Sequence, residues 1–117
     1  MPPKRQSTRV DVLQGTLDLM VLRTLEAMGP LHGFGLARRI EQVSGGTVLL
    51  NQGTIYAALV RLQHRGLISA RWGTSDNNRR AKFYALTRAG QRKLEEGVTA
   101  WERIAAVMAR FLAARTS

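Results

Sequence analysis

Four polar side chains lie close together near the middle of the chain, at Asn51, Gln52, Thr54 and Tyr56. The amides of Asn and Gln can each form two hydrogen bonds with adenine, and hydroxyl groups can bond to several base edges. Two alternatives remain open. Asn51 precedes an apolar run and would equally well cap a helix, and Tyr56 would also pack against a neighbouring element. Because of its amide and hydroxyl groups, the segment is a candidate for reading bases in duplex DNA.

The positive charge of the chain is concentrated around this segment. Residues 51–93 contain nine of the eighteen Lys and Arg residues but only one of the eight acidic residues, Asp76. Charge confined to one folded segment is typical of a surface that binds a polyanion, and nucleic acid is the commonest polyanion. Four basic residues are expected to contact phosphates: Arg61, Arg79, Arg80 and Lys82.

Apolar residues recur at spacings of three and four over the first half of the chain, which predicts helices. The first is expected from Leu13 to Met28 and the second from Gly33 to Ser44. A third is expected to begin at Asn51 and to stop at Gly66. The short, partly β-branched segment from Thr47 to Leu50 is a candidate strand.

A β-hairpin is predicted next. Residues Leu67 to Trp72 and Arg80 to Leu86 suit two strands, and the turn-rich segment Gly73 to Asn78 would join them. Thr87 is then expected to cap a last helix. The predicted hairpin has a polar tip and carries several of the basic residues.

The last helix has an apolar seam with alternating steps of four and three, which is the heptad pattern of a helix that packs on another helix. Because the stripe is larger than a surface helix needs, we expect a second copy of the chain to cover it. The predicted dimer interface consists of Leu94, Val98, Trp101, Ala105, Met108 and Leu112.

Three helices, a basic hairpin and a long helix are the order of a winged helix-turn-helix with a dimerisation arm. The predicted fold is therefore mainly α with a small β-hairpin wing. We expect a flexible basic arm at residues 1–10, a DNA-binding domain at 11–86 and a dimerisation helix at 87–117. In such folds the second helix of the pair enters the major groove, and here that helix starts at Asn51.

At these residues the chain resembles the PadR family, the phenolic-acid-repressor-like transcriptional regulators. The matching stretches include Gly15-Thr16-Leu17-Asp18, Leu31-His32-Gly33-Phe34-Gly35-Leu36, the run Gly53 to Leu62, Arg65-Gly66-Leu67-Ile68 and the run Phe83 to Gly90. The resemblance extends from about Leu13 to Met108. It implies a homodimeric winged-helix regulator, usually a repressor, that leaves a palindromic DNA operator when a small molecule binds.

The resemblance also implies roles for individual residues. The recognition-helix tyrosine of the family falls on Tyr56, and the basic residues of its wing fall on Arg79, Arg80 and Lys82. In compact relatives a tryptophan at the place of Trp101 lines a pore and stacks on flat aromatic ligands, although Trp101 would serve equally as an interface anchor. The implied effector pocket, for planar apolar or cationic molecules, consists of Trp101, Val98, Ala105, Leu19, Leu22 and Asp18.

Other classes of protein find little support in the sequence. The chain has no cysteine, and its two histidines lie far apart without acidic neighbours, so we expect no metal site and no cofactor. No nucleophile and base occur at a diagnostic spacing, so an enzyme is not expected. No apolar run approaches the roughly 20 residues that span a membrane. We expect a cytoplasmic protein.

Two functions from different classes remain. The first is a ligand-responsive, sequence-specific transcriptional regulator that acts as a homodimer. The second is either a sequence-tolerant architectural DNA binder or a dimeric module for protein interaction. The polar cluster of Asn51, Gln52 and Thr54 favours the first, because a protein that binds only phosphates needs no base-reading set.

Overall fold

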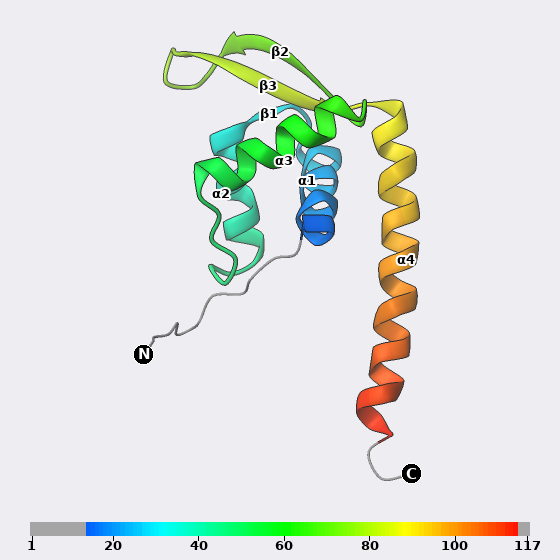
Figure 1. Ribbon diagram of the computed structural model, residues 1–117. Coiled ribbons are helices and arrows are strands. Elements are labelled where there is room, and N and C mark those ends of the chain that lie inside the picture. Colours follow the sequence, from blue (N-terminus) through cyan, green and yellow to red (C-terminus); the bar gives the residue numbers. More distant parts are fainter. Residues whose placement is uncertain (1–13, 115–117) are drawn as a thin grey trace.

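The computed structural model describes residues 14–114 and shows four helices and three strands within them. It is mostly helical with a small antiparallel sheet, which confirms the predicted fold class (Figure 1). The predicted N-terminal arm, residues 1–10, lies outside the described residues. The elements are α1 (Gln14–Met28), β1 (Leu31–His32), α2 (Gly33–Val43), α3 (Gln52–His64), β2 (Ile68–Thr74), β3 (Arg80–Leu86) and α4 (Arg88–Ala113).

Side-chain caps fix where three of the helices begin. Asn51 Oδ1 accepts a hydrogen bond of 2.8 Å from the Thr54 amide, and Thr87 Oγ1 accepts one of 3.0 Å from the Gly90 amide. Both caps confirm the sequence prediction. His32 provides a third cap, because its Nδ1 accepts from the Gly35 amide at 3.0 Å. Each cap satisfies an amide that the first helical turn leaves without a partner.

The sheet has one more strand than the sequence predicts. Its order is β1-β3-β2, with Leu31 opposite Tyr84 and His32 opposite Phe83. The strand expected at 47–50 is wrong, because no strand forms there. Instead, the Val48 amide donates to the Ser44 hydroxyl at 3.0 Å, and the Val48 side chain is buried. A local side-chain bond thus takes the place of strand pairing.

The core lies between α1, α2, α3 and the sheet, and α4 contributes to it through its first half. Leu94 is only 2% exposed, and Val98 packs against the same cluster. Leu94 was expected at the dimer seam, so that assignment is wrong for this residue. The heptad spacing is present in α4, but the first residue of the seam already packs into the core of its own chain, which includes side chains of α1.

The start of α4 is packed tightly against the corner between α3 and β2. A Cβ atom on Gly90 would lie 2.0 Å from the Leu67 carbonyl oxygen, so only glycine fits there. Thr87 secures the same corner, since its hydroxyl donates to the Gly66 carbonyl at 2.8 Å and its amide to the Leu67 carbonyl at 3.1 Å. About two helical turns further along α4, a Cβ atom on Gly97 would lie 2.8 Å from Leu19 Cδ1.

The second half of α4 projects beyond the body of the protein, as Figure 1 shows. Every residue from Trp101 to Ala114 is exposed. The large apolar side chains of this half are between 43% and 72% exposed: Trp101, Ile104, Val107, Met108, Phe111 and Leu112. In residues 14–114 no helix combines the length and apolar character needed to cross a membrane.

Candidate nucleic-acid interface

Helix α3 buries one face and presents a polar face to solvent. Ile55 and Leu59 lie in the core, whereas Gln52 and Thr54 are exposed and Tyr56 is 59% exposed. The side chains that the sequence analysis selected for base contacts therefore stand on the outer surface of the first turns. This is the part of a recognition helix that enters the major groove in helix-turn-helix proteins.

Asn51 has a different role in this arrangement. Its Oδ1 holds the Thr54 amide, and a Cβ on Gly53 would lie only 3.3 Å from the same oxygen. Glycine at position 53 therefore leaves room for the cap. The structure therefore gives Asn51 a role at the helix start, which is one of the two roles that the sequence allows for it.

A groove of about 350 Å³ separates the start of α3 from the β2–β3 hairpin, and we call it the wing groove. Side chains from α3, from the hairpin tip and from β3 line it together. Five of the predicted DNA-binding residues meet there, although they come from two parts of the sequence: Gln52, Tyr56, Arg79, Arg80 and Lys82.

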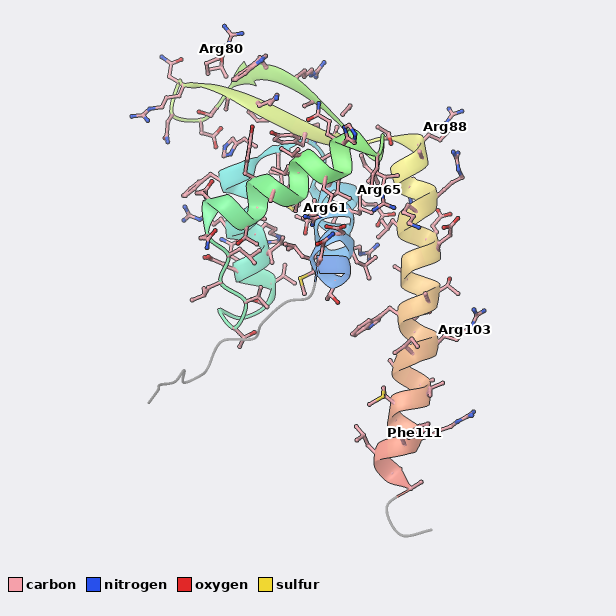
Figure 2. All side chains as sticks on the ribbon, in the orientation of Figure 1. Arg61, Arg65, Arg80, Arg88, Arg103 and Phe111 are labelled. Carbon is pink, nitrogen blue, oxygen red and sulfur yellow. The ribbon has the colours of Figure 1, made fainter. Side chains whose placement is uncertain are left out.

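Hydrogen bonds within the tip of the hairpin set the position of its basic residues. The Ser75 amide donates to the Arg79 carbonyl at 2.8 Å, and the Asn78 amide donates to the Ser75 carbonyl at 2.9 Å. Asn78 has a φ of 60°, a left-handed conformation that asparagine tolerates better than most residues. The turn leads into Arg79 and Arg80 at the start of β3, and both residues line the groove. Figure 2 shows Arg80 near the tip of the hairpin.

Two tyrosines meet at the inner side of the wing groove. Burial raises the pKa of Tyr84, and the nearby Tyr56 raises this pKa further. Tyr84 therefore keeps its proton at neutral pH and adds no negative charge to the basic face. From the sequence, Tyr84 belongs to the predicted strand Arg80 to Leu86, and no local pattern indicates that it lies beside Tyr56.

Arg61 does not belong to this face. Its Nη2 atom lies 2.5 Å from Asp18 Oδ1 and its Nε atom 3.5 Å from Asp18 Oδ2, which joins α3 to α1. The side chains are 28% and 13% exposed, respectively. The sequence analysis expected Arg61 to contact phosphate, and we correct that assignment because a carboxylate of the protein holds the guanidinium.

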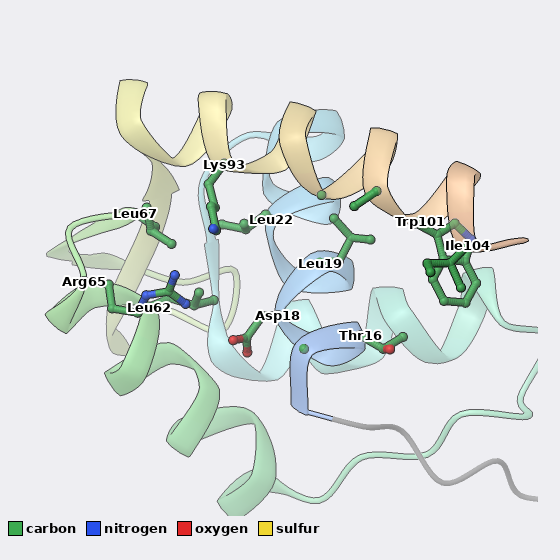
Figure 3. Close-up of a pocket in the computed structure, with 13 residues that line it drawn as sticks. Thr16, Asp18, Leu19, Leu22, Leu62, Arg65, Leu67, Lys93, Trp101 and Ile104 are labelled. Atoms are coloured by element: carbon green, nitrogen blue, oxygen red, sulfur yellow. The ribbon is translucent and has the colours of Figure 1, made fainter.

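A second groove, of about 560 Å³, lies between α1, α3 and α4, and we call it the helix groove (Figure 3). Four of the six residues proposed for the effector pocket line it: Asp18, Leu19, Leu22 and Trp101. Val98 and Ala105 do not, and Gly97 and Ile104 take their places. The face of α4 toward α1 is rotated by one residue from the heptad seam, which explains the difference.

The two ends of the helix groove differ in chemistry. Trp101 and Ile104 form an apolar end, whereas Arg65 and Lys93 bring positive charge to the other end (Figure 3). Asp18 lies in the groove, but its carboxylate is already paired with Arg61. Arg65 and Lys93 are not predictable as groove residues from the sequence, because only the folded chain brings them to the same groove. Across residues 14–114 no group of acidic and histidine side chains is arranged to hold a metal ion.

The fold and the basic face define a winged helix-turn-helix protein, and comparisons with known proteins agree. A family profile described as the transcriptional regulator PadR-like family matches residues 21–96. A PadR family transcription regulator from Clostridium difficile is 32% identical, with 82% of this chain and 97% of that chain aligned and a TM-score of 0.71.

Two further structures share the fold at lower identity. A protein from Streptococcus mutans has a TM-score of 0.79 and 18% identity over 92% of this chain and 96% of that chain. A PadR-like transcriptional regulator from Bacillus cereus has a TM-score of 0.73 and 23% identity over 85% of this chain and 93% of that chain. The chain therefore belongs to the PadR-like family, whose members are transcriptional regulators and not enzymes. Membership in this family implies DNA binding.

The ion pair between Asp18 and Arg61 gives a first prediction. Replacing Asp18 by Ala leaves a partly buried guanidinium without its partner, so we expect the free energy of unfolding to fall by about 1–3 kcal/mol. Arg61→Ala should cost a similar amount, and the double variant should lose less than the sum of the two. Denaturant unfolding measures all three.

Arg80→Ala provides the matched control, because Arg80 is exposed and its loss should change stability by less than about 0.5 kcal/mol. DNA affinity separates the two arginines: Arg61→Ala should retain it under conditions where the variant is folded. If Arg61→Ala kept full stability and lost DNA affinity, the arginine would be a phosphate contact and our correction would be wrong.

Proposed function

We propose that this chain is a homodimeric transcriptional repressor that binds a specific, palindromic DNA site in the cytoplasm and releases it when a planar aromatic molecule binds. The wing groove carries this proposal. It places exposed base-reading groups of α3, Gln52 and Tyr56, beside the cations Arg79, Arg80 and Lys82. Phosphate contacts position a protein on DNA and contacts to base edges select the sequence, and this surface has groups for both.

Repression is the simpler of the two regulatory outcomes for such a protein. A protein that covers a DNA site excludes other proteins from it, whereas activation requires an additional surface that recruits a partner. In residues 14–114, the basic face and the exposed half of α4 are the two surfaces for which the chemistry suggests a macromolecular partner. We assign the first to DNA and the second to another copy of the chain.

The exposed half of α4 supports the homodimer. Six large apolar side chains between Trp101 and Leu112 remain between 43% and 72% exposed among the described residues. Full burial of one such side chain contributes roughly 1.5–3 kcal/mol, so leaving all six in water is unfavourable. We therefore propose a dimer interface formed by Trp101, Ala105, Met108 and Leu112, with Val98 at its edge and Leu94 excluded.

The helix groove supports a small-molecule effector. An aromatic ring can stack on Trp101 beside Ile104, while Arg65 and Lys93 favour a negative group at the other end. From the sequence and the family resemblance, the expected effectors are planar apolar or cationic molecules. The cations of the groove and the pairing of Asp18 with Arg61 lead us to propose neutral or anionic planar molecules instead.

Selection of bound duplexes from random DNA tests the proposed function directly. We expect one palindromic site, preferred over random DNA by about 10³-fold or more at physiological salt. Its half-sites should be centred about 34–36 Å apart, one helical turn, because two copies of α3 would enter successive major grooves. The Tyr56→Ala variant should keep its fold, since Tyr56 is exposed, and should lose affinity for this site. Binding without sequence preference would instead identify an architectural binder, and no binding an interaction module.

Leu112→Glu tests the dimer. A charge within the proposed apolar interface should convert the protein to a monomer, as measured by sedimentation equilibrium at micromolar concentration. Ala106→Glu introduces the same charge on the side of α4 that carries Arg103 and Arg110, and this control should remain dimeric. A dimer that survives Leu112→Glu unchanged would refute the interface.

Fluorescence tests the effector site. In a Trp72→Phe variant, Trp101 is the only tryptophan, so all tryptophan emission comes from a residue that lines the helix groove. Titration with 2-naphthoate should quench this emission in a saturable manner and lower affinity for the selected DNA site. A naphthalene of the same ring size with an ammonium group should bind more weakly, because Arg65 and Lys93 repel it. Absence of saturable quenching by either compound, with the dimer intact, would argue against the site.

A further inference from the structure

An exposed tryptophan on the wing contacts two of the cations assigned to DNA. The Arg80 guanidinium carbon lies 4.9 Å from the centre of the Trp72 ring, and Lys82 Nζ lies 5.9 Å from it. Both distances fall within the range in which a cation is attracted to the face of an aromatic ring. From the sequence, Trp72 is only the last residue of a predicted strand.

The strand register places these three side chains on one face of the hairpin. Trp72 is directly opposite Lys82 in the antiparallel pair of β2 and β3, and Arg80 is two residues before Lys82. Side chains two residues apart on a strand point to the same side of the sheet. Tyr84 follows by two more residues, so the face continues toward Tyr56 and α3. Arg71, next to Trp72, lies on the opposite face, where Phe83 is its partner.

An aromatic partner leaves the positive charge of an arginine or lysine in place, whereas a carboxylate partner neutralises it. Asp18 neutralises Arg61 and holds it toward the body of the protein, whereas the Trp72 ring carries no charge to cancel. Within residues 14–114 neither Arg80 nor Lys82 forms an ion pair. The ring therefore orders two flexible side chains while their positive charges and N–H donors stay available to an outside anion. Ordering before binding reduces the entropy lost when the complex forms.

We propose that Trp72 is a positioning residue of the wing, which holds Arg80 and Lys82 side by side so that they can bind phosphates of the DNA backbone. This inference rests on the proposed function, because it assumes that the wing meets DNA. The ring is 58% exposed, so its role in the core of the protein is small. Trp72 acts through the two cations, and its loss should affect DNA affinity far more than stability.

A set of substitutions at positions 72 and 80 tests the proposal on the full chain, with the DNA site found by selection. Trp72→Ala should weaken binding by about 5- to 30-fold at constant salt, the loss expected for two exposed cation–aromatic contacts. Trp72→Phe keeps a ring and should stay within about 3-fold of the parent. Trp72→Leu keeps apolar bulk without a ring and should behave like Trp72→Ala, which separates ring electrostatics from packing.

A double-mutant cycle identifies the residue through which Trp72 acts. If Trp72 positions Arg80, the two substitutions are not independent. The fold-loss of affinity in the Trp72→Ala, Arg80→Ala double variant should then be much smaller than the product of the two single fold-losses. Arg71→Ala is the matched control, since it removes the same charge from the other face of the same hairpin, and its effect should multiply with that of Trp72→Ala. Thermal unfolding of each variant verifies that the fold is kept.

Three results would overturn the inference: parental affinity for Trp72→Ala, equal affinity for the Leu and Phe variants, or fully multiplicative losses for positions 72 and 80. The proposed function fails separately. It fails if the parent protein itself shows no preference for any duplex, whereas a parent that binds its site normally while Trp72→Ala binds equally well refutes only the role of Trp72.

Discussion

The contact between the backbone of α4 at Gly90 and the carbonyl of Leu67 joins the two halves of this protein. A Cβ atom at Gly90 would lie 2.0 Å from that oxygen, so the helix can approach only because the residue has no side chain. Thr87 adds hydrogen bonds to Gly66 and Leu67 at the same corner. The corner follows directly after α3. The direction of α4, and with it the placement of the proposed dimer seam relative to the recognition helix, therefore depends on this corner together with the close approach of Gly97 to Leu19 of α1.

The elements that depend on local pattern were predictable from the sequence. The four helices, the hairpin and the caps at Asn51 and Thr87 all follow from residue types within a few positions of one another. Strand β1 was not predictable, because two residues carry no periodicity and their partners in β3 lie about fifty positions further along. Spatial pairing, and not local preference, decides such short strands.

The candidate sites show the same division between local and distant information. Gln52, Tyr56, Arg79, Arg80 and Lys82 were selected by residue type, and the structure brings them to one groove. Arg61 looked equivalent to the other arginines because its partner, Asp18, is distant in the sequence. The heptad seam correctly described one stripe of α4, but spacing alone does not say whether α1 or a second copy covers a given turn. Leu94 was misassigned for that reason.

Arginine has two opposite uses in this small domain, and the neighbouring residue selects between them. Beside Asp18, the charge of Arg61 contributes to cohesion between α1 and α3. Beside Trp72, the charge of Arg80 remains directed at the surroundings of the protein. A count of basic residues therefore overestimates the charge offered to a polyanion, and the structure shows which residue to subtract. The hairpin loses none of its charge in this way, because its four basic side chains, Arg71, Arg79, Arg80 and Lys82, stand against a single acid, Asp76.

Because α4 is long, a small tilt at its anchored end produces a larger displacement at its far end. At 26 residues the helix is about 39 Å long, and it is held at one end while its far half stands clear of the body. A tilt of about 5° at the Gly90 corner would move the far end of such a rigid rod by roughly 3 Å. The helix groove lies beside this rod from Lys93 to Ile104, and its charged end is close to the Gly90 corner. A small molecule bound there would therefore tilt α4 from a point near its fixed end, and the C-terminal end of the helix would move the furthest.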